Sequence, residues 1–550
     1  MTHKPGSNQI SFQLVTMDRD DDDFGEGFIA ESHPLRPTLG SQLSVPLGRN
    51  DSRAPSISSS VSDLDAPIYT RETTVPVQHG GLNGRLLFAI AAAALGSSFQ
   101  HGYNTGVVNP PQSLIESWIK SVKGNRTGEE VSQEQVTAIW SIAVAIFCVG
   151  GMIGGALVGT IADRFGRKGG LLLINILVVI TVFLEGFSKM AASYEMLIVG
   201  RLIIGINSGL NAGLAPMYLA EISPMHLRGA VGTVYQLVIT ISILIAQILG
   251  MNQLLGTEQH WPLLLSLTIV PAIFQCLTLP LCPESPKYLL LCKGKDVDAQ
   301  RSLTWLRSSN DVYEEMEEMR AEYESMKMLP TVGLRDLFVN STLRIPLVIA
   351  IMVMLAQQLS GINAVMFFST KIFKMASLDD AAAQSATMGV GAMNVVMTLV
   401  SLVLVEKCGR KTLLLFGFGG MVIDTALLTI SISYADVSTA AAYLSIIFVI
   451  LFVVLFATGP GSIPWFLVSE LFNQSARPAA TSISIAINWS ANFIVSIAFL
   501  PLQEALGPKV FIIFVVIQLF FTLFIWRKVP ETKNKTIEEI SSMFRQISYQ

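Results

Sequence analysis

The chain has little charge for its length. Asp, Glu, Lys and Arg make up 14% of its 550 residues, whereas 51% of the residues are hydrophobic and the mean hydropathy is +0.52. Soluble domains carry about 25% charged residues, so an ordinary soluble globular protein is excluded. The net charge of −4 comes from an acidic N-terminal stretch that includes Asp20–Asp23. With no basic excess, we expect no binding to nucleic acid.

Cysteine and histidine are also scarce. The five cysteines have neither the spacing of a disulfide framework nor that of a zinc site. They are Cys148, Cys276, Cys282, Cys292 and Cys408. Six histidines, with no cluster of nucleophile, base or metal-ligating groups, leave nothing to carry catalysis. We therefore expect no metal, no cofactor and no enzymatic activity.

Long apolar runs are what the chain has in abundance. Each run of about 20 residues can cross the bilayer hydrocarbon as a helix, which predicts an all-α membrane protein with the lipid bilayer as its surroundings. Twelve such spans are expected, at 86–108, 138–162, 169–188, 196–218, 229–250, 261–282, 345–368, 383–405, 412–433, 440–466, 479–501 and 507–527.

Lys and Arg in the short connections predict the orientation. They gather in alternate loops, for example at Arg164, Arg228 and Arg410. Because such cations stay on the cytoplasmic side, both termini are expected in the cytoplasm. The polar N-terminus shows no cleavable signal peptide, so the first span must direct insertion. Residues 1–84, rich in Ser, Pro and Asp, are expected to form a disordered tail, and the sequence identifies no cytoplasmic partner for it.

This orientation leaves one plausible glycosylation site. The loop 109–137 faces outward and contains the sequon at Asn125, which makes the protein a predicted glycoprotein. Five other sequons fall on cytoplasmic or intramembrane stretches, where glycans are not added: Asn50, Asn340, Asn473, Asn488 and Asn534.

An internal repeat divides the membrane part. Three charged motifs recur in order, at offsets of 243, 249 and 247 residues: RFGRK (164–168) with KCGRK (407–411), Glu221 and Arg228 with Glu470 and Arg477, and PESPK (283–287) with PETKN (530–534). Because each repeat has six spans, both insert with the same orientation. We expect two parallel six-helix bundles, 85–283 and 344–528.

The connecting segment and the end of the chain are polar. Between the bundles, 284–343 carries Met316, Met319, Tyr323 and Met326 at helical spacing among glutamates, which predicts a cytoplasmic insert with an amphipathic helix. Residues 529–550 are expected to form a short cytoplasmic tail.

Several motifs together resemble those of one family. They are DRFGRK (163–168), PESPK (283–287), QQLSGINAV (357–365), GPGSIPWF (459–466), NWSANF (488–493) and VPETK (529–533). With twelve spans in two repeats, the chain over about 85–535 resembles the sugar porters of the major facilitator superfamily, and most of all the class I animal facilitative glucose transporters. The resemblance implies a multi-pass plasma-membrane uniporter that carries hexoses, chiefly glucose, by alternating access.

Uncharged amides deep in the spans suit a sugar. A hexose entering a membrane protein loses hydrogen bonds to water, and each unreplaced bond costs about 1–3 kcal/mol. Carboxamides both donate and accept without burying charge. They stand at Asn104, Asn109, Gln236, Gln247, Gln357, Gln358, Asn363, Asn394, Asn488 and Asn492. A single buried amide more often ties helices together, whereas the constellation favours a site.

Two interrupted spans strengthen this interpretation. Gly361 in span seven offers a break that lets Gln357, Gln358 and Asn363 converge, and span ten is interrupted around Gly459. The resemblance implies that the sugar-contacting positions are Gln236, Gln357, Gln358, Asn363, Asn394, Trp465 and Asn492, with Asn488 and Trp489 beside them.

Charged residues at the cytoplasmic ends of the spans are candidates for a gate. Positive-inside topology explains the cations but not glutamates at matching places in both repeats. The resemblance implies salt bridges between the halves that close the inner side. The gating residues would be Arg164, Arg167, Glu221, Arg228, Glu406, Arg410, Glu470 and Arg477.

The sequence leaves the coupling open. Asn104 stands where proton-coupled relatives carry an acid, which favours uniport because an amide does not titrate. Asp424, in the middle of span nine, favours a proton-coupled sugar symporter, whereas Glu185, at the outer end of span three, is expected to reach water. A third alternative is a membrane sugar sensor that does not transport and signals through the N-terminal tail.

The substrate preference is open as well. Met354, Leu355 and Ala356 replace a Gln-Leu-Ser typical of glucose-selective relatives, so fructose is a possible second substrate, whereas Trp465 and Asn488 favour glucose.

Overall fold

A computed structural model describes residues 81–328, 332–473, 475–535 and 537–549. The expected disordered tail, 1–84, lies outside the described residues except for its last four. All described residues belong to one compact unit, Val75–Gln550. Within them the regular structure is entirely helical, as predicted.

The first half begins with a span made of α1 (Gly84–Ala93), a π-helical turn (Ala94–Ser98) and α2 (Phe99–Gly106). The helices that follow are α3 (Gln112–Thr127), α4 (Gln133–Phe165), α5 (Arg167–Leu173), α6 (Asn175–Gly186), α7 (Tyr194–Ile222), a 3-10 turn (Met225–Leu227), α8 (Arg228–Leu249), α9 (Trp261–Ser266), α10 (Ile269–Thr278) and a 3-10 turn (Leu279–Leu281).

The connecting segment contains a π-helical turn (Tyr288–Cys292), α11 (Asp296–Arg307), α12 (Tyr313–Lys327) and α13 (Leu334–Val339). The helix predicted from the methionine spacing is α12, and the side chains of Met316 and Met319 are buried against Leu303. These two methionines therefore pack the helix onto α11, whereas Tyr323, a third residue of the predicted pattern, is exposed.

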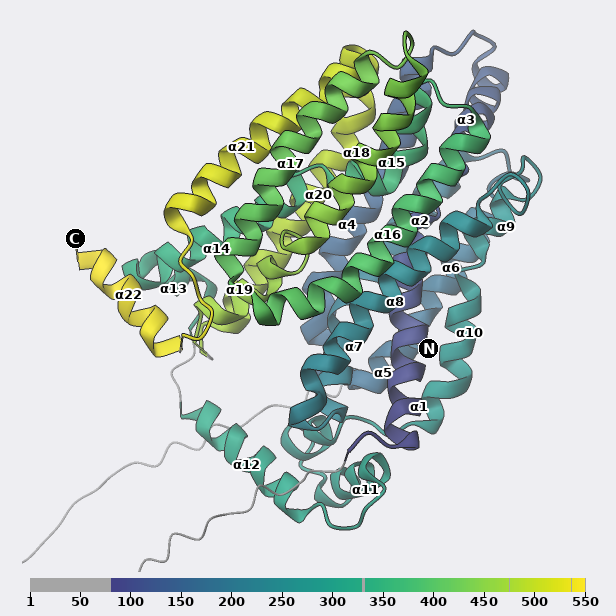
Figure 1. Cartoon of the computed structure of the whole chain (residues 1–550). Helices are drawn as coiled ribbons and strands as arrows, with labels where there is room; N and C mark the ends of the chain where they lie inside the picture. Colours follow the sequence, from purple (N-terminus) through teal and green to yellow (C-terminus); the bar gives the residue numbers. More distant parts are fainter. Residues whose placement is uncertain (1–80, 329–331, 474, 536, 550) are drawn as a thin grey trace, which may run out of the picture. The chain divides into compact units, whose positions relative to one another are not determined.

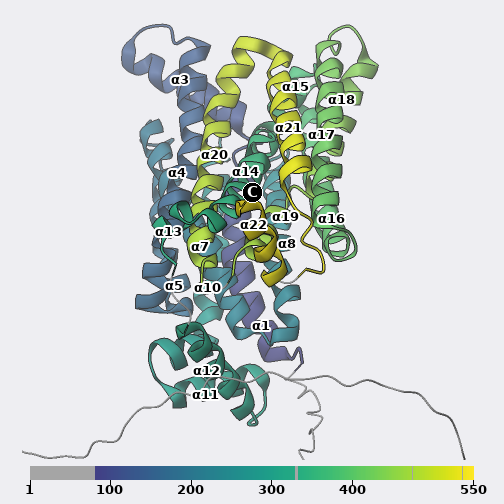
Figure 2. The same cartoon turned by 90° about the vertical axis from the view of Figure 1, so that its left-hand side faces the viewer.

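The second half contains α14 (Ser341–Leu359), α15 (Ile362–Met375), α16 (Asp380–Lys407), α17 (Arg410–Ser433), α18 (Thr439–Thr458), α19 (Ile463–Leu471), α20 (Arg477–Leu506), a 3-10 turn (Gly507–Lys509), α21 (Val510–Lys528) and α22 (Ile537–Tyr549). Helix α17 lies beside α21 and α18 (Figures 1 and 2).

The helices account for the twelve predicted spans. Ten stretches of the described chain are long and apolar enough to cross a membrane. One of them, Arg477–Lys528, contains both α20 and α21, and the first span, Gly84–Gly106, is a further continuous helix outside that set. Together these give the twelve spans that the sequence predicts.

The predicted break in span seven is present. Gly361 separates α14 from α15 with a φ of +100°, a left-handed conformation that glycine adopts without strain. A Cβ at this position would lie 3.1 Å from Cδ1 of Phe514, so the packing also favours glycine. Span ten is likewise interrupted between α18 and α19, where a Cβ on Gly459 would lie 2.4 Å from the carbonyl oxygen of Leu413.

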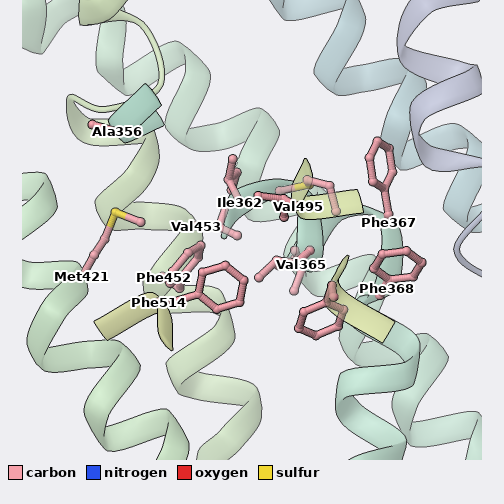
Figure 3. Packing of buried hydrophobic residues seen from close by; sticks show 14 of the residues in the cluster. Ala356, Ile362, Val365, Phe367, Phe368, Met421, Phe452, Val453, Val495 and Phe514 are labelled. Atoms are coloured by element: carbon pink, nitrogen blue, oxygen red, sulfur yellow. The ribbon is translucent and has the colours of Figure 1, made fainter. Parts of the chain in front are cut away.

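Aromatic side chains fill the second half around this break. The rings of Phe368 and Phe499 stack with centroids 5.6 Å apart, and Phe514 packs against Phe499. Figure 3 shows Phe368 and Phe514 among the buried side chains of this cluster. Offset ring contacts of this kind add about 0.5–1.5 kcal/mol to the burial of their apolar area. The core therefore holds α15, α20 and α21 together next to the broken span.

Small residues bring helices close together in the first half. A Cβ on Gly205 of α7 would lie 2.2 Å from the carbonyl oxygen of Phe147, and one on Gly209 would lie 2.3 Å from that of Gly151. The glycines spaced four residues apart therefore allow a close approach between α4 and α7.

Candidate functional site

The break in span seven gathers the amides of α14. Gln357 is 3% exposed, and its Nε2 donates to the carbonyl oxygens of Pro460 (3.1 Å) and Gly461 (2.7 Å), in the interruption between α18 and α19. Those carbonyls have lost their helical partners because the chain is broken there. Gln357 thus connects the two interrupted spans.

Asn488 of α20 completes a network of carboxamides. Its Nδ2 donates to Oε1 of Gln357 at 2.7 Å, and its Oδ1 accepts from Nε2 of Gln358 at 3.0 Å. Oε1 of Gln358 in turn accepts from Asn363 of α15. Four of the nine predicted sugar-contacting residues therefore meet in one network of neutral donors and acceptors from α14, α15 and α20. All four belong to the second half.

Trp489 lies where the two halves meet. Its ring stacks on His101 of α2, with centroids 6.2 Å apart, and meets Phe147 of α4 edge-on at 6.2 Å. A Cβ on Gly151 of α4 would lie 2.6 Å from the indole. His101 also contacts the hydroxyl of Tyr235 at 3.2 Å. His101 and Tyr235 are not among the residues predicted from the sequence, although both lie mid-span, where polar aromatic groups are uncommon.

The remaining predicted residues do not join the network. Asn492 is buried and accepts from the hydroxyl of Ser496 at 3.1 Å, one turn along the same helix. Gln236 and Trp465 are exposed, and Asn394 is half-buried. The structure thus brings together the second-half amides, whereas Gln236, from the first half, takes no part in the network.

Other amides tie the first-half helices to one another. Nε2 of Gln100 donates to Asn175 at 2.9 Å, and Asn175 donates to Gln275 at 2.9 Å. Asn211 donates to Gln100 at 3.3 Å. These four buried amides connect α2, α6, α7 and α10. None of the four was predicted from the sequence, although their position inside the apolar spans marked them as buried polar groups.

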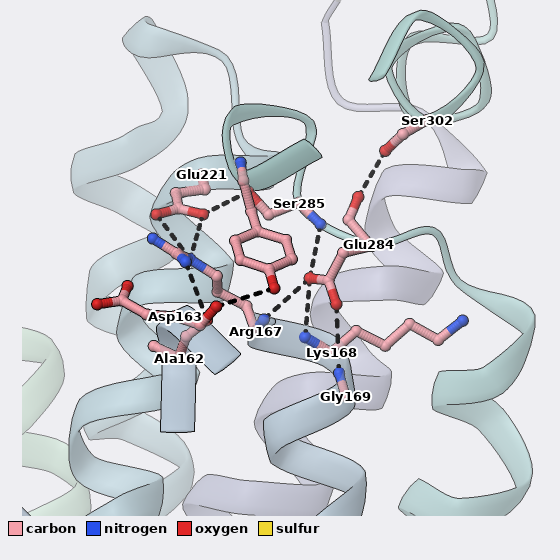
Figure 4. Close-up of polar contacts among 10 residues, drawn as sticks. Ala162, Asp163, Arg167, Lys168, Gly169, Glu221, Glu284, Ser285 and Ser302 are labelled. Carbon is pink, nitrogen blue, oxygen red and sulfur yellow. Dashed lines mark hydrogen bonds and ion pairs between the residues drawn. The ribbon is translucent and has the colours of Figure 1, made fainter. Parts of the chain in front are cut away.

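An ion-pair network lies at the end of the first half that the sequence predicts to be cytoplasmic (Figure 4). Arg167 Nε lies 2.9 Å from Glu221 Oε2, and Glu221 also accepts from the hydroxyl of Ser285. The carboxylate of Glu284 accepts from the backbone N–H groups of Arg167 (3.1 Å) and Lys168 (2.9 Å) at the start of α5. It therefore caps the positive end of that helix.

The second half repeats this network. Arg410 Nη2 lies 2.9 Å from Glu470, and Thr532 also donates to Glu470. Glu531 accepts from the backbone N–H groups of Arg410 (2.8 Å) and Lys411 (3.1 Å). The repeat predicted from charged motifs thus extends to individual hydrogen bonds. Glu284 and Glu531 were missed as site residues, although the PESPK and PETKN motifs marked them.

Where their side chains are described, the residues predicted to form the gate contact their own half in this structure, and not the opposite half as the resemblance implied. Both ion pairs, Arg167 with Glu221 and Arg410 with Glu470, join helices of the same half. The remaining contacts are Arg164 over the ring of Phe165 (5.6 Å), Arg228 Nε to the carbonyl oxygen of Ser223 (3.4 Å) and Arg477 Nη2 to that of Phe472 (3.4 Å). The side chain of Glu406 lies outside the part of the chain that the structure describes.

The comparison with known families decides the identity. The family model described as "Sugar (and other) transporter" matches residues 89–544. The chain belongs to the sugar transporter family. Membership of a transporter family agrees with the expectation that the chain is not an enzyme.

The sugar transporter is similar to several curated relatives. It is 46% identical over 465 residues to the solute carrier family 2, facilitated glucose transporter member 1 of Gallus gallus, covering 84% of this chain and 94% of that one. It is also 46% identical over 459 residues to facilitated glucose transporter member 3 of Mus musculus, covering 84% and 92%.

Solved structures agree with the fold of the transporter. The partially occluded inward-open xylose transporter XylE of E. coli matches with a TM-score of 0.70 and 25% identity, over 82% of this chain and 100% of that one. The proton:xylose symporter XylE bound to 6-bromo-6-deoxy-D-glucose matches with a TM-score of 0.66 and 26% identity, over 84% and 99%.

The two halves of the transporter are hydrogen-bonded at the ends opposite the two ion-pair networks. Asn109 donates to the carbonyl oxygen of Met366 (3.0 Å) and to Ser369 (2.6 Å), and accepts from the backbone N–H of Thr370 (3.1 Å). Thr137 of α4 also donates to Glu504 of α20. These contacts connect the two halves at those ends in the conformation seen here.

The two acids flagged inside the spans are both buried. Asp424 of α17 is 2% exposed, and neither of its oxygens has a hydrogen-bond partner among the described residues. Glu185 is 0% exposed, so the expectation that it reaches water was wrong. The error arose because the position of Glu185 along α6 was inferred from the sequence, whereas the packing of α7, α9 and α10 around that helix was not.

Proposed function

We propose that the protein is a facilitative hexose transporter that carries glucose down its gradient by alternating access. The observation that carries the proposal is the neutral carboxamide network of Gln357, Gln358, Asn363 and Asn488 at the broken span. A hexose hydroxyl can exchange with an amide–amide bond at little net cost, because donors and acceptors stay satisfied. The 46% identity to facilitated glucose transporters supports the same substrate class.

The proposed sugar site extends the network to the flanking residues. Gln236 from the first half and Asn394, Trp465, Trp489 and Asn492 from the second would surround the hexose. In this assignment Trp489 provides an apolar face for the C–H groups of the ring. Because Trp489 also contacts α2 and α4, the sugar would be enclosed where the two halves move against one another.

The gating residues would change partners during the cycle. In this structure their ion pairs lie within each half, and the outer ends of the halves are hydrogen-bonded. We infer that partners from the opposite half are engaged when the inner side closes. Exposed pairs contribute about 0–1 kcal/mol each, so several together bias the equilibrium between the two states without locking it.

The same proposal includes location and orientation. The transporter would lie in the plasma membrane with both termini in the cytoplasm, and Asn125 would carry a glycan on the outer face. Asn125 is exposed near the end of α3. This exposure supports the assignment because the sequon must be accessible to be modified.

Uniport is favoured over proton symport by Asn104. Its Nδ2 donates to the carbonyl oxygen of Gln100 (2.8 Å) and to Thr268 (2.9 Å), so a neutral amide occupies the position expected of an acid in proton-coupled relatives. Proton symport is the second candidate, because Asp424 and Glu185 are buried carboxyl groups in the membrane part.

Uptake of labelled glucose into proteoliposomes, with and without a pH gradient, tests the proposal. Uptake that stops at equal concentrations in both conditions supports uniport. If the pH gradient drives glucose to accumulate inside the vesicles, the protein is a proton symporter and not a uniporter. Sugar binding without uptake would indicate a sensor. Competition of glucose uptake by fructose then measures the preference that Met354, Leu355 and Ala356 leave open.

A further inference from the structure

Glu185 and Arg201 form a buried electrostatic element outside the proposed sugar site. Glu185, on α6, is 0% exposed, and Arg201, on α7, is 2% exposed. Neither oxygen of Glu185 has a hydrogen-bond partner among the described residues, and the same is true of Nε and Nη2 of Arg201. Full burial of two ionisable groups with unused hydrogen-bonding capacity is costly, and it calls for a functional account.

The two side chains are neighbours without forming an ion pair. A Cβ on Gly200, the residue before Arg201, would lie 2.6 Å from Cγ of Glu185, so the acid packs directly onto α7. Arg201 instead donates from Nη1 to the carbonyl oxygen of Asn104 at 3.1 Å, and its guanidinium lies 4.7 Å from the centre of the Phe147 ring. The cation–π contact with the ring face replaces part of the stabilisation that the guanidinium loses when it is buried away from water.

Few other ionisable groups surround Glu185. The elements packed against α6 are α7, α9, α10 and α5, and Tyr103 of α2 also faces the carboxyl group. The hydroxyl of Tyr103 is already used, since it donates to the carbonyl oxygen of Leu264 at 2.6 Å. Helix α9 has no ionisable side chain and α10 has only Cys276. The cations of α5, Arg167 and Lys168, belong to the ion-pair network of the first half, and Cys148 of α4 faces Arg201.

The element is linked to the boundary between the halves. The Phe147 ring, over which the Arg201 guanidinium lies, meets Trp489 of α20 edge-on. Sγ of the neighbouring Cys148 lies 3.9 Å from Oγ of Ser496, also on α20. A movement of the guanidinium away from Phe147 would therefore alter the contact between α4 and α20. That contact joins the two halves next to the proposed sugar site.

We propose that Glu185 is a proton-binding site that makes hexose transport depend on pH. The carboxyl group holds a proton in the packing seen here, because a carboxylate with neither hydrogen bonds nor an ion pair is strongly disfavoured in a buried position. Loss of the proton to bulk water leaves a carboxylate, which pairs with the free N–H groups of Arg201. The guanidinium then leaves Phe147, and the rate of transport changes. The effect on transport rests on the proposed function, whereas the proton site itself does not.

Infrared titration of the purified protein tests the proton site without any sugar. The wild type should show a protonated-carboxyl band that shifts in D2O and disappears as the pH rises, and Glu185→Gln should lack it. Asp424→Asn removes the other carboxyl group buried within the described spans and serves as the matched control, which should keep the Glu185 band; Glu116 is also buried but lies outside the spans and is present in every variant. If the Glu185→Gln spectrum is the same as that of the wild type over the whole titration, the proposal is wrong.

Transport at equal pH on both sides of the vesicle tests the consequence. Between about pH 5 and about pH 8.5, wild-type glucose exchange should change about fivefold or more, the lower end of typical coupling between sites. Glu185→Gln and Glu185→Met should both give a flat profile, and Asp424→Asn should follow the wild type. A flat wild-type profile, or an unchanged profile in both Glu185 variants, overturns the proposal. If no vesicle transports hexose, the proposed function fails and the infrared result still decides the proton site.

Discussion

Gln357 of α14 and Asn488 of α20 are joined by a 2.7 Å hydrogen bond from Nδ2 of the asparagine to Oε1 of the glutamine. The same glutamine donates to the carbonyl oxygens of Pro460 and Gly461, so one side chain connects two interrupted spans to a third helix. In a membrane interior this arrangement both stabilises the helices and presents neutral polar groups. A substitution in a residue that only stabilises the helices should lower the thermal midpoint, whereas one in a residue that binds sugar should lower the sugar affinity.

Gln357→Leu should weaken sugar binding about 10- to 100-fold, which is the loss expected from one or two hydrogen bonds to a desolvated ligand. Gln275→Leu is the control, because Gln275 is an equally buried amide in the first-half network. It should lower the thermal midpoint while leaving the affinity of the folded protein unchanged. Glucose affinity close to wild type in Gln357→Leu would make this residue a structural connector only.

Gly361→Ala should reduce both stability and transport. Alanine at a φ of +100° is strained, and its Cβ would lie 3.1 Å from Phe514; together these should cost about 1–3 kcal/mol. Gly159→Ala is the control, because no neighbouring atom lies within 4 Å of a Cβ at this position in α4. It should be neutral or slightly stabilising. Thermal unfolding in detergent and glucose uptake measure both effects, and equal midpoints for the two variants would contradict the argument.

Glu221→Gln and Glu470→Gln should shift the conformational equilibrium without unfolding the protein. Each removes one ion pair at matching places in the two halves, worth about 1 kcal/mol at partial exposure. We expect a several-fold change in net efflux in both variants, with thermal midpoints within a few degrees of wild type. Glu322→Gln breaks the more exposed pair with Lys287 and should leave transport unchanged. Unaltered efflux in both repeat variants would exclude these residues from the gate.

Glu116, on α3 outside the membrane-spanning stretches, should make stability depend on pH. Burial raises the pKa of this carboxyl group above its usual value, although Gln112, Lys371 and Lys374 oppose the shift. Because the folded state holds the proton more tightly than the unfolded state, stability should fall as the pH rises through the usual and then the raised pKa. Glu116→Gln should weaken this fall in the thermal midpoint between about pH 4 and about pH 8. Glu129→Gln, at an exposed position, should not weaken the fall. Equal slopes of the thermal midpoint against pH in the two variants would refute the assignment of this pH dependence to Glu116.

Asn125→Gln should remove a single glycan. The variant expressed in animal cells should migrate faster than wild type on a denaturing gel, and glycosidase treatment should abolish the difference. Asn534→Gln, at a sequon predicted to lie in the cytoplasm, should migrate like wild type. Equal mobility of Asn125→Gln and wild type before glycosidase treatment would contradict the proposed orientation of α3.

The sequence by itself determined the spans, the repeat and the break at Gly361. A bilayer requires helices of a fixed apolar length, and this requirement can be read locally along the chain. Charged motifs such as those containing Glu284 and Glu531 also mark the repeat, because both copies cap the same kind of helix end. Fold class and family could therefore be predicted before any tertiary contact was known.

Only the tertiary structure decided which amides meet and which acids are buried. Gln357 and Asn488 are 131 residues apart in the chain, and Gln100 and Asn175 are 75 apart, yet one pair joins the proposed site and the other ties helices together. The partner of a mid-span polar group depends on how each helix is rotated and how far it is displaced along its neighbours. A local pattern does not contain this information, which is why the burial of Glu185 beside Arg201 was mispredicted from the sequence.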